Sequence, residues 1–139
     1  MKKYLLCLTF LLASFQLCCS QTVLKGKSFK ALIGNVCAET NEYNPCASHM
    51  IHLVLNFRDQ DVIFTEKNVN SCGEDVTSRI QAKWKIDSAG RVALSYSSKI
   101  PKGNFLEGFR LQLKGDKLIG YKKDWQNSMV EYKFEKMKE

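Results

Sequence analysis

The stretch RIQAKWKIDSAGRVALSYSS, from Arg79 to Ser98, decides the fold class of this chain. Apolar residues occupy every second position in both of its halves, which is the period of a half-buried strand. They are Ile80, Ala82, Trp84 and Ile86, then Val92, Leu94 and Tyr96. The segment Ser88–Gly90 between the halves predicts a tight turn, with glycine where a positive φ is needed. The stretch therefore predicts a β-hairpin.

The same alternation recurs on both sides of this hairpin. It predicts further strands over Ser28–Val36, Ser48–Phe57, Val62–Glu66, Phe105–Lys114, Lys117–Lys123 and Ser128–Met137, with a loop over Asn70–Ser78. The third of these has an alternative end at Val69. Glu107 falls on the inward parity of its strand, which favours a strand that begins after it. About eight short antiparallel strands without a helix avoid open edges by closing on themselves. We therefore predict an all-β, antiparallel up-and-down barrel, with a two-sheet sandwich as the alternative.

The first 20 residues have the pattern of a secretory signal peptide. A short basic start is followed by an apolar run from Tyr4 to Phe15 and then by small residues. Cleavage after Ser20 would leave a single domain over residues 21–139. The alternative is acylation at Cys18 or Cys19, which would anchor the protein to the cell envelope. We expect a secreted or periplasmic protein.

The charge is unevenly distributed along the chain. From Arg79 to Glu139 there are 14 basic and 7 acidic residues, whereas Gln21–Ser78 holds 5 basic and 7 acidic ones. Because the lysines alternate with apolar residues, we interpret them as the solvated outer faces of strands. The alternative is a face for an acidic partner or an anionic surface. No nucleic-acid-binding motif is present, so we expect no nucleic acid partner.

Three short segments resemble the small bacterial lipocalin-like domains, which are secreted or lipoprotein barrels of eight strands. The segments are Leu24–Leu32, Lys83–Asp87 and Glu131–Lys136. In the first, Phe29 stands where that family more often has a tryptophan that closes one end of the barrel. The resemblance implies the barrel fold, and it implies no functional residue because these domains host unrelated functions.

Three cysteines follow the predicted signal peptide, so one disulfide and one thiol are expected in an oxidising compartment. In an up-and-down barrel Cys37, Cys46 and Cys72 all lie at one end. We favour Cys37–Cys46, which would close the longest loop, with Cys72 as the alternative partner. A tetrahedral metal site of these cysteines and His49 is a further alternative, which we set aside because no CxxC spacing supports it. We predict no metal and no cofactor.

No catalytic constellation is recognisable, and both histidines lie on one predicted strand. We therefore expect a monomeric binding protein and not an enzyme. Aromatic residues on the inward faces fit a small apolar or amphipathic ligand in the barrel, lined by Trp84, Tyr96, Phe109 and Tyr132. Filling of the core is the other explanation for them. The alternative function is a protein-binding inhibitor, immunity or envelope-assembly factor that acts through the loops at the cysteine end.

Overall fold

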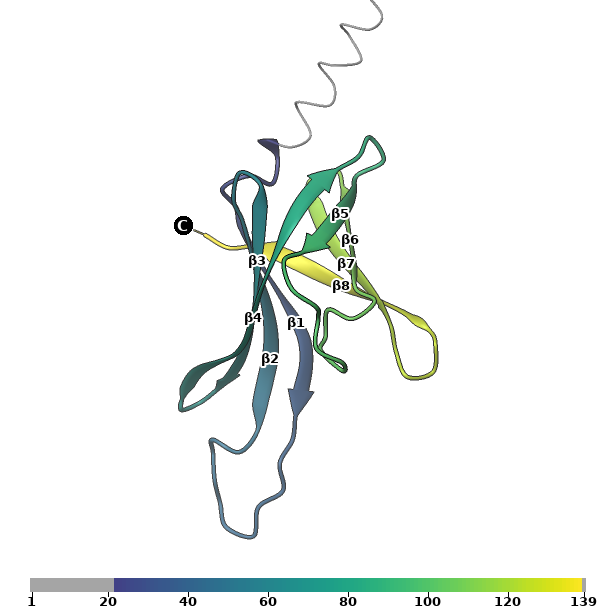
Figure 1. The fold of residues 1–139 in the computed structure, drawn as a ribbon. Helices are drawn as coiled ribbons and strands as arrows, with labels where there is room; N and C mark the ends of the chain where they lie inside the picture. The colour runs from purple at the N-terminus through teal and green to yellow at the C-terminus, as the bar shows by residue number, and fades with distance from the viewer. Residues whose placement is uncertain (1–21, 139) are drawn as a thin grey trace, which may run out of the picture.

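The computed structural model describes residues 22–138, and this part of the chain folds into eight antiparallel strands that close into a barrel (Figure 1). The predicted all-β barrel is confirmed, and the sandwich is not formed. The predicted signal peptide over residues 1–20, with Cys18 and Cys19, lies outside the described residues. The strands are β1 (Ser28–Val36), β2 (His49–Phe57), β3 (Asp61–Asn70), β4 (Gly73–Ile86), β5 (Arg91–Tyr96), β6 (Arg110–Lys114), β7 (Lys117–Lys123) and β8 (Met129–Lys136).

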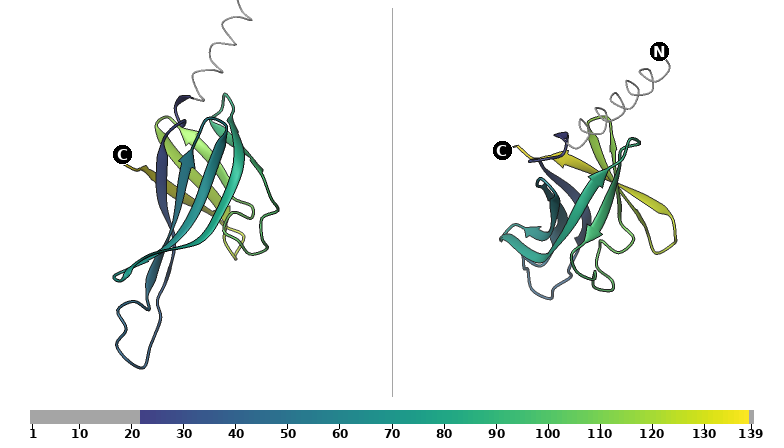
Figure 2. Two further views of the ribbon diagram at one scale, coloured as in Figure 1. Left: turned by 60° about the vertical axis from the view of Figure 1, so that its left-hand side comes forward. Right: turned by 45° about the horizontal axis from the view of Figure 1, so that its top comes forward.

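The barrel is closed by ladders of very different length. β3 and β4 pair over the whole of β3, whereas β8 reaches β1 only at Phe29 and Lys30. Likewise β5 reaches β6 only at Arg91 and Val92. Parts of β1 to β4 therefore continue beyond the closed section as a projecting sheet (Figures 1 and 2). We define the projecting sheet as residues 32–36, 49–52, 66–70 and 73–78, and the end of the barrel from which it extends as the cysteine end.

The β4–β5 hairpin forms as the sequence predicts, and its turn depends on one glycine. Gly90 has a φ of 80°, a conformation that glycine adopts without steric cost. A Cβ atom at this position would lie 2.1 Å from the carbonyl oxygen of Leu113 on the neighbouring strand. The carboxylate of Asp87 holds the turn by accepting hydrogen bonds from the backbone N–H groups of Ala89 and Arg91, both at 2.9 Å. The turn thus requires both glycine and aspartate.

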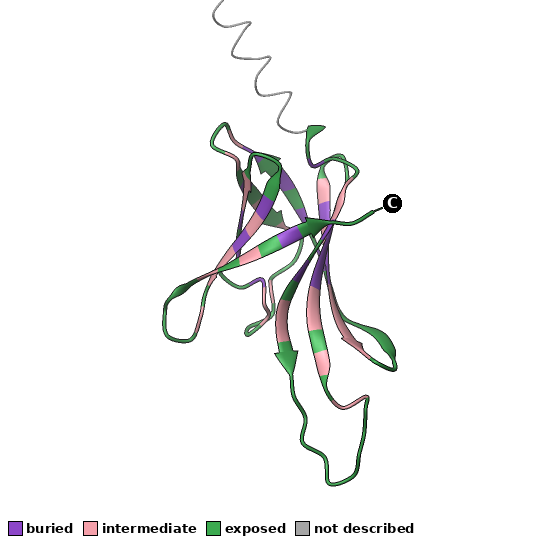
Figure 3. Ribbon diagram, turned by 180° about the vertical axis from the view of Figure 1, so that it is seen from behind, coloured by how far each residue is buried: buried purple, intermediate pink, exposed green. Residues whose placement is uncertain are grey.

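Inward side chains fill the closed part of the barrel, and buried positions alternate with exposed ones along the strands (Figure 3). Opposite the cysteine end, Phe57 packs edge-on against Phe29 and Trp84, with ring centroids 5.9 and 5.1 Å apart. Leu24, which precedes β1, is fully buried in the same core cluster. This part of the interior is a packed core, as is usual for small barrels.

Two predicted boundaries are wrong. The predicted loop over Asn70–Ser78 is mostly strand, because β3 runs to Asn70 and β4 begins at Gly73. Apolar and polar residues do not alternate over 73–77 because this part of the β3–β4 ladder projects past the core and both of its faces are exposed. The sixth strand begins at Arg110 instead of Phe105, since the chain turns through Gly108 at a φ of 71°. Glu107 accepts a hydrogen bond from the N–H of Gly103 within this loop, which confirms that the strand begins after it.

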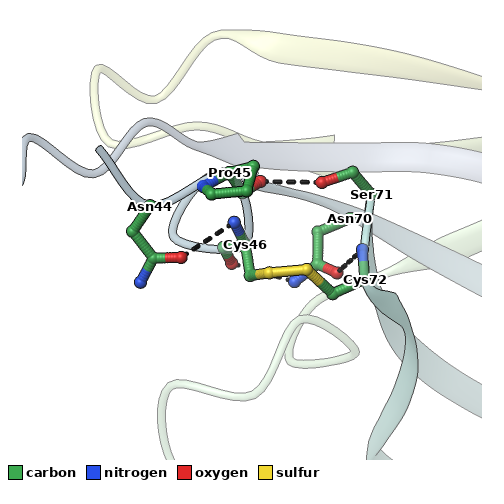
Figure 4. The surroundings of a disulfide bond; sticks show 6 residues. All are labelled: Asn44, Pro45, Cys46, Asn70, Ser71 and Cys72. Atoms are coloured by element: carbon green, nitrogen blue, oxygen red, sulfur yellow. Dashed lines mark hydrogen bonds between the residues drawn. A yellow bond between two sulfur atoms is a disulfide. The ribbon is translucent and has the colours of Figure 1, made fainter.

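The disulfide joins Cys46 to Cys72, with Cα atoms 5.6 Å apart (Figure 4). It leaves Cys37 as an exposed thiol. The favoured pairing of Cys37 with Cys46 is therefore wrong, and the alternative partner is the correct one. The register gives the reason: Met50 lies opposite Val69, so the chain just before β2 meets the chain just after β3. Hydrogen bonds of 2.9 Å from Asn70 to the carbonyl of Cys46, and from Ser71 to that of Pro45, reinforce this junction. The disulfide is consistent with an oxidising compartment outside the cytoplasm.

Candidate functional site

A cleft of about 510 Å³ opens at the cysteine end of the barrel, between the projecting sheet and the β5–β6 loop. The sheet supplies one wall, and the loop, residues 97–109, supplies the other. Lining residues include the apolar Ile33, Ile51 and Phe105 and the polar or charged Glu66, Thr77, Ser78, Lys102, Asn104 and Lys122. Its lining is polar and apolar in about equal measure, which suits an amphipathic molecule better than a wholly apolar one.

Two opposite charges enter this cleft from different strands. Glu66 on β3 lies across from Leu53 of the core, so its side chain is on the inner face of the sheet. Lys122 on β7 follows buried Leu118 and Gly120 at intervals of two, which places it on the inner face as well. None of the ion pairs in the described part of the chain includes Glu66 or Lys122. Both charges therefore face the cleft without neutralising each other in a direct pair.

The carboxylate of Glu66 is held by a neighbour on β4. The hydroxyl of Thr77 donates to Glu66 Oε1 at 3.2 Å, and it also lies 3.3 Å from the Glu66 carbonyl oxygen. The β3–β4 register shifts between Glu66 and Lys67, so Thr77 is the extra residue of a β-bulge. Bulges re-aim side chains at barrel rims. Here the bulge brings a hydroxyl to the cleft carboxylate and orients it.

Lys122 on β7 contacts the loop that forms one wall of the cleft. Its ammonium donates hydrogen bonds to the carbonyl oxygens of Asn104 and Phe105, and it lies 4.9 Å from the centroid of the Phe105 ring. Burial lowers the pKa of Lys122, and the nearby charge of Glu107 opposes this effect. The lysine thus carries a partly desolvated positive charge at the mouth of the cleft.

Phe105 connects the cleft to two of the residues that the sequence singled out. Its ring centroid lies 5.4 Å from that of Phe109 and 5.1 Å from that of Tyr132, which it meets edge-on. Phe109 is buried and Tyr132 is half-buried. Burial, followed by the charge of Asp124, raises the pKa of Tyr132. Phe109 and Tyr132 therefore form a second layer behind the cleft wall.

The other two predicted ligand residues lie elsewhere. Trp84 packs at the opposite end of the barrel, where its indole Nε1 donates to the carbonyl oxygen of Arg58 at 3.1 Å. Tyr96, at the end of β5, packs against Phe64 with ring centroids 6.0 Å apart, and burial raises its pKa to about 12. The structure thus joins Phe109 and Tyr132 to the cleft through Phe105 and places Trp84 at the other end of the barrel, while Tyr96 lies just before the loop wall without lining the cleft. Ligand contact by any of the four stays a prediction.

The exposed thiol of Cys37 lies in a second groove, of about 400 Å³, between the ends of β1, β2 and β3. His49 also lines this groove, but the disulfide uses two of the three cysteines that a metal site would need. Among residues 22–138 no group of three or more His, Cys, Asp or Glu side chains is arranged to hold a metal ion. In the same residues no helix has the length and hydropathy to cross a membrane.

The sequence pointed to the aromatic residues of the barrel and missed the charged pair Glu66 and Lys122. Parity could have found Lys122, because it continues the series of Leu118 and Gly120 at the end of a predicted strand. Glu66 could be found in the same way, as an acidic residue two positions after Phe64. A charged residue on the inward parity near the end of a predicted strand indicates that this end of the strand lies at the open mouth of the barrel. Which charges then share one cleft depends on the strand order and the ladder lengths.

Comparison of the chain with models of protein families, with curated proteins and with solved structures found no match. The closed barrel of eight antiparallel strands is consistent with the lipocalin-like fold that the sequence resembles.

Proposed function

We propose that this is a secreted, non-catalytic binding protein whose ligand is a small amphipathic molecule held in the cleft at the cysteine end. The observation that carries the proposal is the lining of the cleft. Ile33, Ile51 and Phe105 offer an apolar surface, while Glu66 and Lys122 offer charges that have no ion-pair partner among the described residues. A ligand with an apolar body and a polar or charged head satisfies both sets of groups.

The packed interior supports a ligand at the mouth in place of one deep in the barrel. Trp84, Phe109 and Phe134 are buried in one continuous core cluster. Lys122 and Glu66 reach the cleft from opposite walls, so they fix the orientation of a bound head group. The partial desolvation of Lys122 strengthens its attraction for an anionic or strongly polar group, because the effective dielectric constant is lower there than in water.

Binding can be tested on residues 21–139 with the disulfide formed, by titration with two fluorescent probes. The probes are 1-anilinonaphthalene-8-sulfonate, which is anionic and amphipathic, and N-phenyl-1-naphthylamine, which is uncharged. Ser78→Trp fills the cleft, and we expect it to abolish uptake of both probes. Ser95→Trp is the matched control, because Ser95 is exposed and lies opposite Lys83 on the outer face. Uptake by Ser78→Trp equal to that of Ser95→Trp would contradict the proposal.

The charge of the cleft is tested separately. We expect Lys122→Met to weaken binding of the anionic probe by roughly tenfold, as is usual for the loss of a charged hydrogen-bond donor. Binding of the uncharged probe should weaken less, because it loses only the support that Lys122 gives to the loop wall. Lys123→Met is the control, since Lys123 lies on the outer face next in sequence. An equal loss for both probes would mean that Lys122 acts only by holding the loop.

The packed interior also supports a second candidate, a protein-binding role through the loops at the cysteine end. The Cys46–Cys72 disulfide links the β1–β2 connection to the β3–β4 hairpin and presents both as one unit. Native mass spectrometry separates the two functions. A small mass that is lost on denaturation supports the ligand-binding role, and purification of the protein only as a complex with another chain supports the protein-binding role.

A further inference from the structure

The β7–β8 hairpin carries the most exposed tryptophan of the described residues at its tip. It projects from the body of the barrel (Figures 1 and 2). Trp125 is 89% exposed, and Met129, where β8 begins, is 44% exposed. The Trp125 ring takes part in none of the aromatic pairs of the described residues. The indole therefore contributes little to the packing of the barrel and is available for contact with a partner.

The tip presents this indole on a rigid turn. The carboxylate of Asp124 accepts hydrogen bonds from the N–H groups of Gln126 and Ser128 at 2.9 and 2.8 Å. The backbone adds bonds of 2.9 Å from Asp124 to Ser128 and 3.0 Å from Asn127 to Asp124. Asn127 adopts a φ of 65°, a left-handed conformation that asparagine tolerates. Since the turn is already ordered, placing its indole in a new environment costs little conformational entropy.

The turn segment 123–129 contains one acid, Asp124. Its carboxylate keeps its negative charge but is turned toward backbone N–H groups, and Gln126, Asn127 and Ser128 are uncharged. The first free charge beyond the turn is positive: Lys123 lies opposite Met129 in the last pair of the β7–β8 ladder. The tip therefore combines an exposed aromatic ring with an adjacent cation.

Further cations lie on the same outer face. Arg110 on β6 is opposite Tyr121, which is opposite Glu131 on β8. A shallow pocket of about 230 Å³ joins these strands, and it is lined by Arg91, Arg110, Leu111, Gln112, Tyr121 and Met129. Arg91 is paired with Asp87, whereas Arg110 takes part in none of the ion pairs of the described residues. The same face also holds Glu131 and Lys114, whose ammonium lies 5.3 Å from the centroid of the Tyr121 ring, so its cations outnumber its acids. We call it the Trp125 face: Arg110, Lys114, Tyr121, Lys123, Trp125, Met129 and Glu131.

We propose that the Trp125 face docks on an anionic membrane surface, with the indole of Trp125 at the level of the lipid head groups. Indole rings are favoured at membrane interfaces because they are apolar with one polar end. Basic side chains close to a membrane are attracted to anionic lipids. A convex tip with a single exposed ring fits a deformable lipid interface better than a flat protein surface.

The docking follows from surface residues alone and does not depend on the proposed ligand function. It has a consequence for the cleft, however. In an up-and-down barrel the β7–β8 turn and the β5–β6 loop lie at the same end. A membrane bound by the Trp125 face would therefore lie near the mouth of the cleft. This arrangement would let an amphipathic molecule pass between the bilayer and the protein.

Sedimentation with lipid vesicles tests the docking. We expect residues 21–139 to bind vesicles of phosphatidylcholine mixed with phosphatidylglycerol and to bind vesicles of pure phosphatidylcholine much less. Bound protein should dissociate from the anionic vesicles as the salt concentration is raised. Trp125→Ala should lose several-fold of the affinity, while Tyr43→Ala, which removes a 94% exposed ring from the β1–β2 loop, should not. Lys123→Glu should weaken binding roughly tenfold, and Lys85→Glu, an equal charge change on β4, much less.

Fluorescence distinguishes insertion of the tip from general charge attraction. The emission of Trp125 should shift to shorter wavelength on anionic vesicles, and Trp125→Phe should lose this shift because the remaining Trp84 is already buried. Binding that is equal for Trp125→Ala and Tyr43→Ala would overturn the proposal, as would binding equal for both vesicle types. Absence of vesicle binding by the folded wild-type protein would also overturn it and would leave the Trp125 face to a protein partner.

Discussion

The ammonium of Lys122 lies 4.9 Å from the centroid of the Phe105 ring and donates a hydrogen bond to the carbonyl oxygen of the same residue. One lysine on β7 thereby holds the β5–β6 loop in two ways. Because Phe105 in turn packs on Phe109 and Tyr132, the contact couples the loop wall of the cleft to the barrel.

Replacement of this lysine should loosen the loop without unfolding the barrel. We expect Lys122→Met to cost about 1 kcal/mol, since charged hydrogen bonds and cation–π contacts at partly exposed sites have this size. Backbone amides from Phe105 to Phe109 should exchange faster with solvent, while those of β2 and β3 should not change. Lys123→Met, which leaves the loop contacts intact, is the control. Unchanged exchange in Lys122→Met would show that the loop is held by ring packing alone.

Gly120 on β7 makes room for the rings of the core. A Cβ atom there would lie 2.5 Å from two ring carbons of Phe109 and 3.0 Å from the ring of Phe134. We expect Gly120→Ala to lower the free energy of unfolding by about 1–3 kcal/mol through overpacking. Gly34→Ala is the matched control in β1, because its nearest contact, with Ile51, would be an ordinary 3.6 Å. Denaturant unfolding of the two variants measures the difference, and equal stabilities would show that the core rings shift freely.

The disulfide should stabilise the protein, and the free thiol should not. Cys46 and Cys72 close a segment with a sequence separation of 26 residues, for which the chain-entropy model gives about 3.5 kcal/mol. We expect Cys72→Ser, made with Cys37→Ser to prevent a new pairing, to lose stability on this scale in urea unfolding. Cys37→Ser alone should leave the unfolding midpoint unchanged. A midpoint that falls equally in the single and the double variant would mean that Cys37 takes part in the disulfide.

Tyr96 should make stability depend on pH in the alkaline range. Burial raises its pKa to about 12, above the ordinary value of 10.0. Between these values the unfolded chain loses the tyrosine proton and the folded chain keeps it, so stability falls as pH rises from 10 toward 12. The hydroxyl is also buried without a hydrogen-bond partner among the described residues.

Tyr96→Phe should therefore remove part of the alkaline loss and keep or raise stability at neutral pH, because no buried polar group is then left unpaired. Absorbance titration of the phenols and unfolding at several pH values measure both effects. Tyr43→Phe is the control, since Tyr43 is 94% exposed. A destabilised Tyr96→Phe would mean that the hydroxyl has a partner, such as an ordered water.

Much of the barrel was predictable because most of its strands have one face against the core. The hairpin from Arg79 to Ser98 shows this: Trp84 and Ile86 alternate with exposed lysines, and the structure pairs them with Leu94 and Val92 as expected. The turn at Gly90 was predictable as well, because few residues other than glycine tolerate its backbone conformation. The ends of β3, β4 and β6 were not predictable in this way. The β3–β4 ladder continues past the core, where its residues lose the alternation, and β6 begins only after the turn at Gly108.

The sequence by itself determined the fold class, the inward residues of the closed barrel and the presence of a cysteine cluster at one end, because each follows from period, parity or order along the chain. Tertiary structure alone decided the disulfide partner, since the β2–β3 register brings the chain before Met50 to the chain after Val69. It also decided the cleft. Glu66 and Lys122 are distant in sequence and carry no local signal of each other, and they share a cavity because β1 to β4 extend beyond the closed section, where the β5–β6 loop faces them.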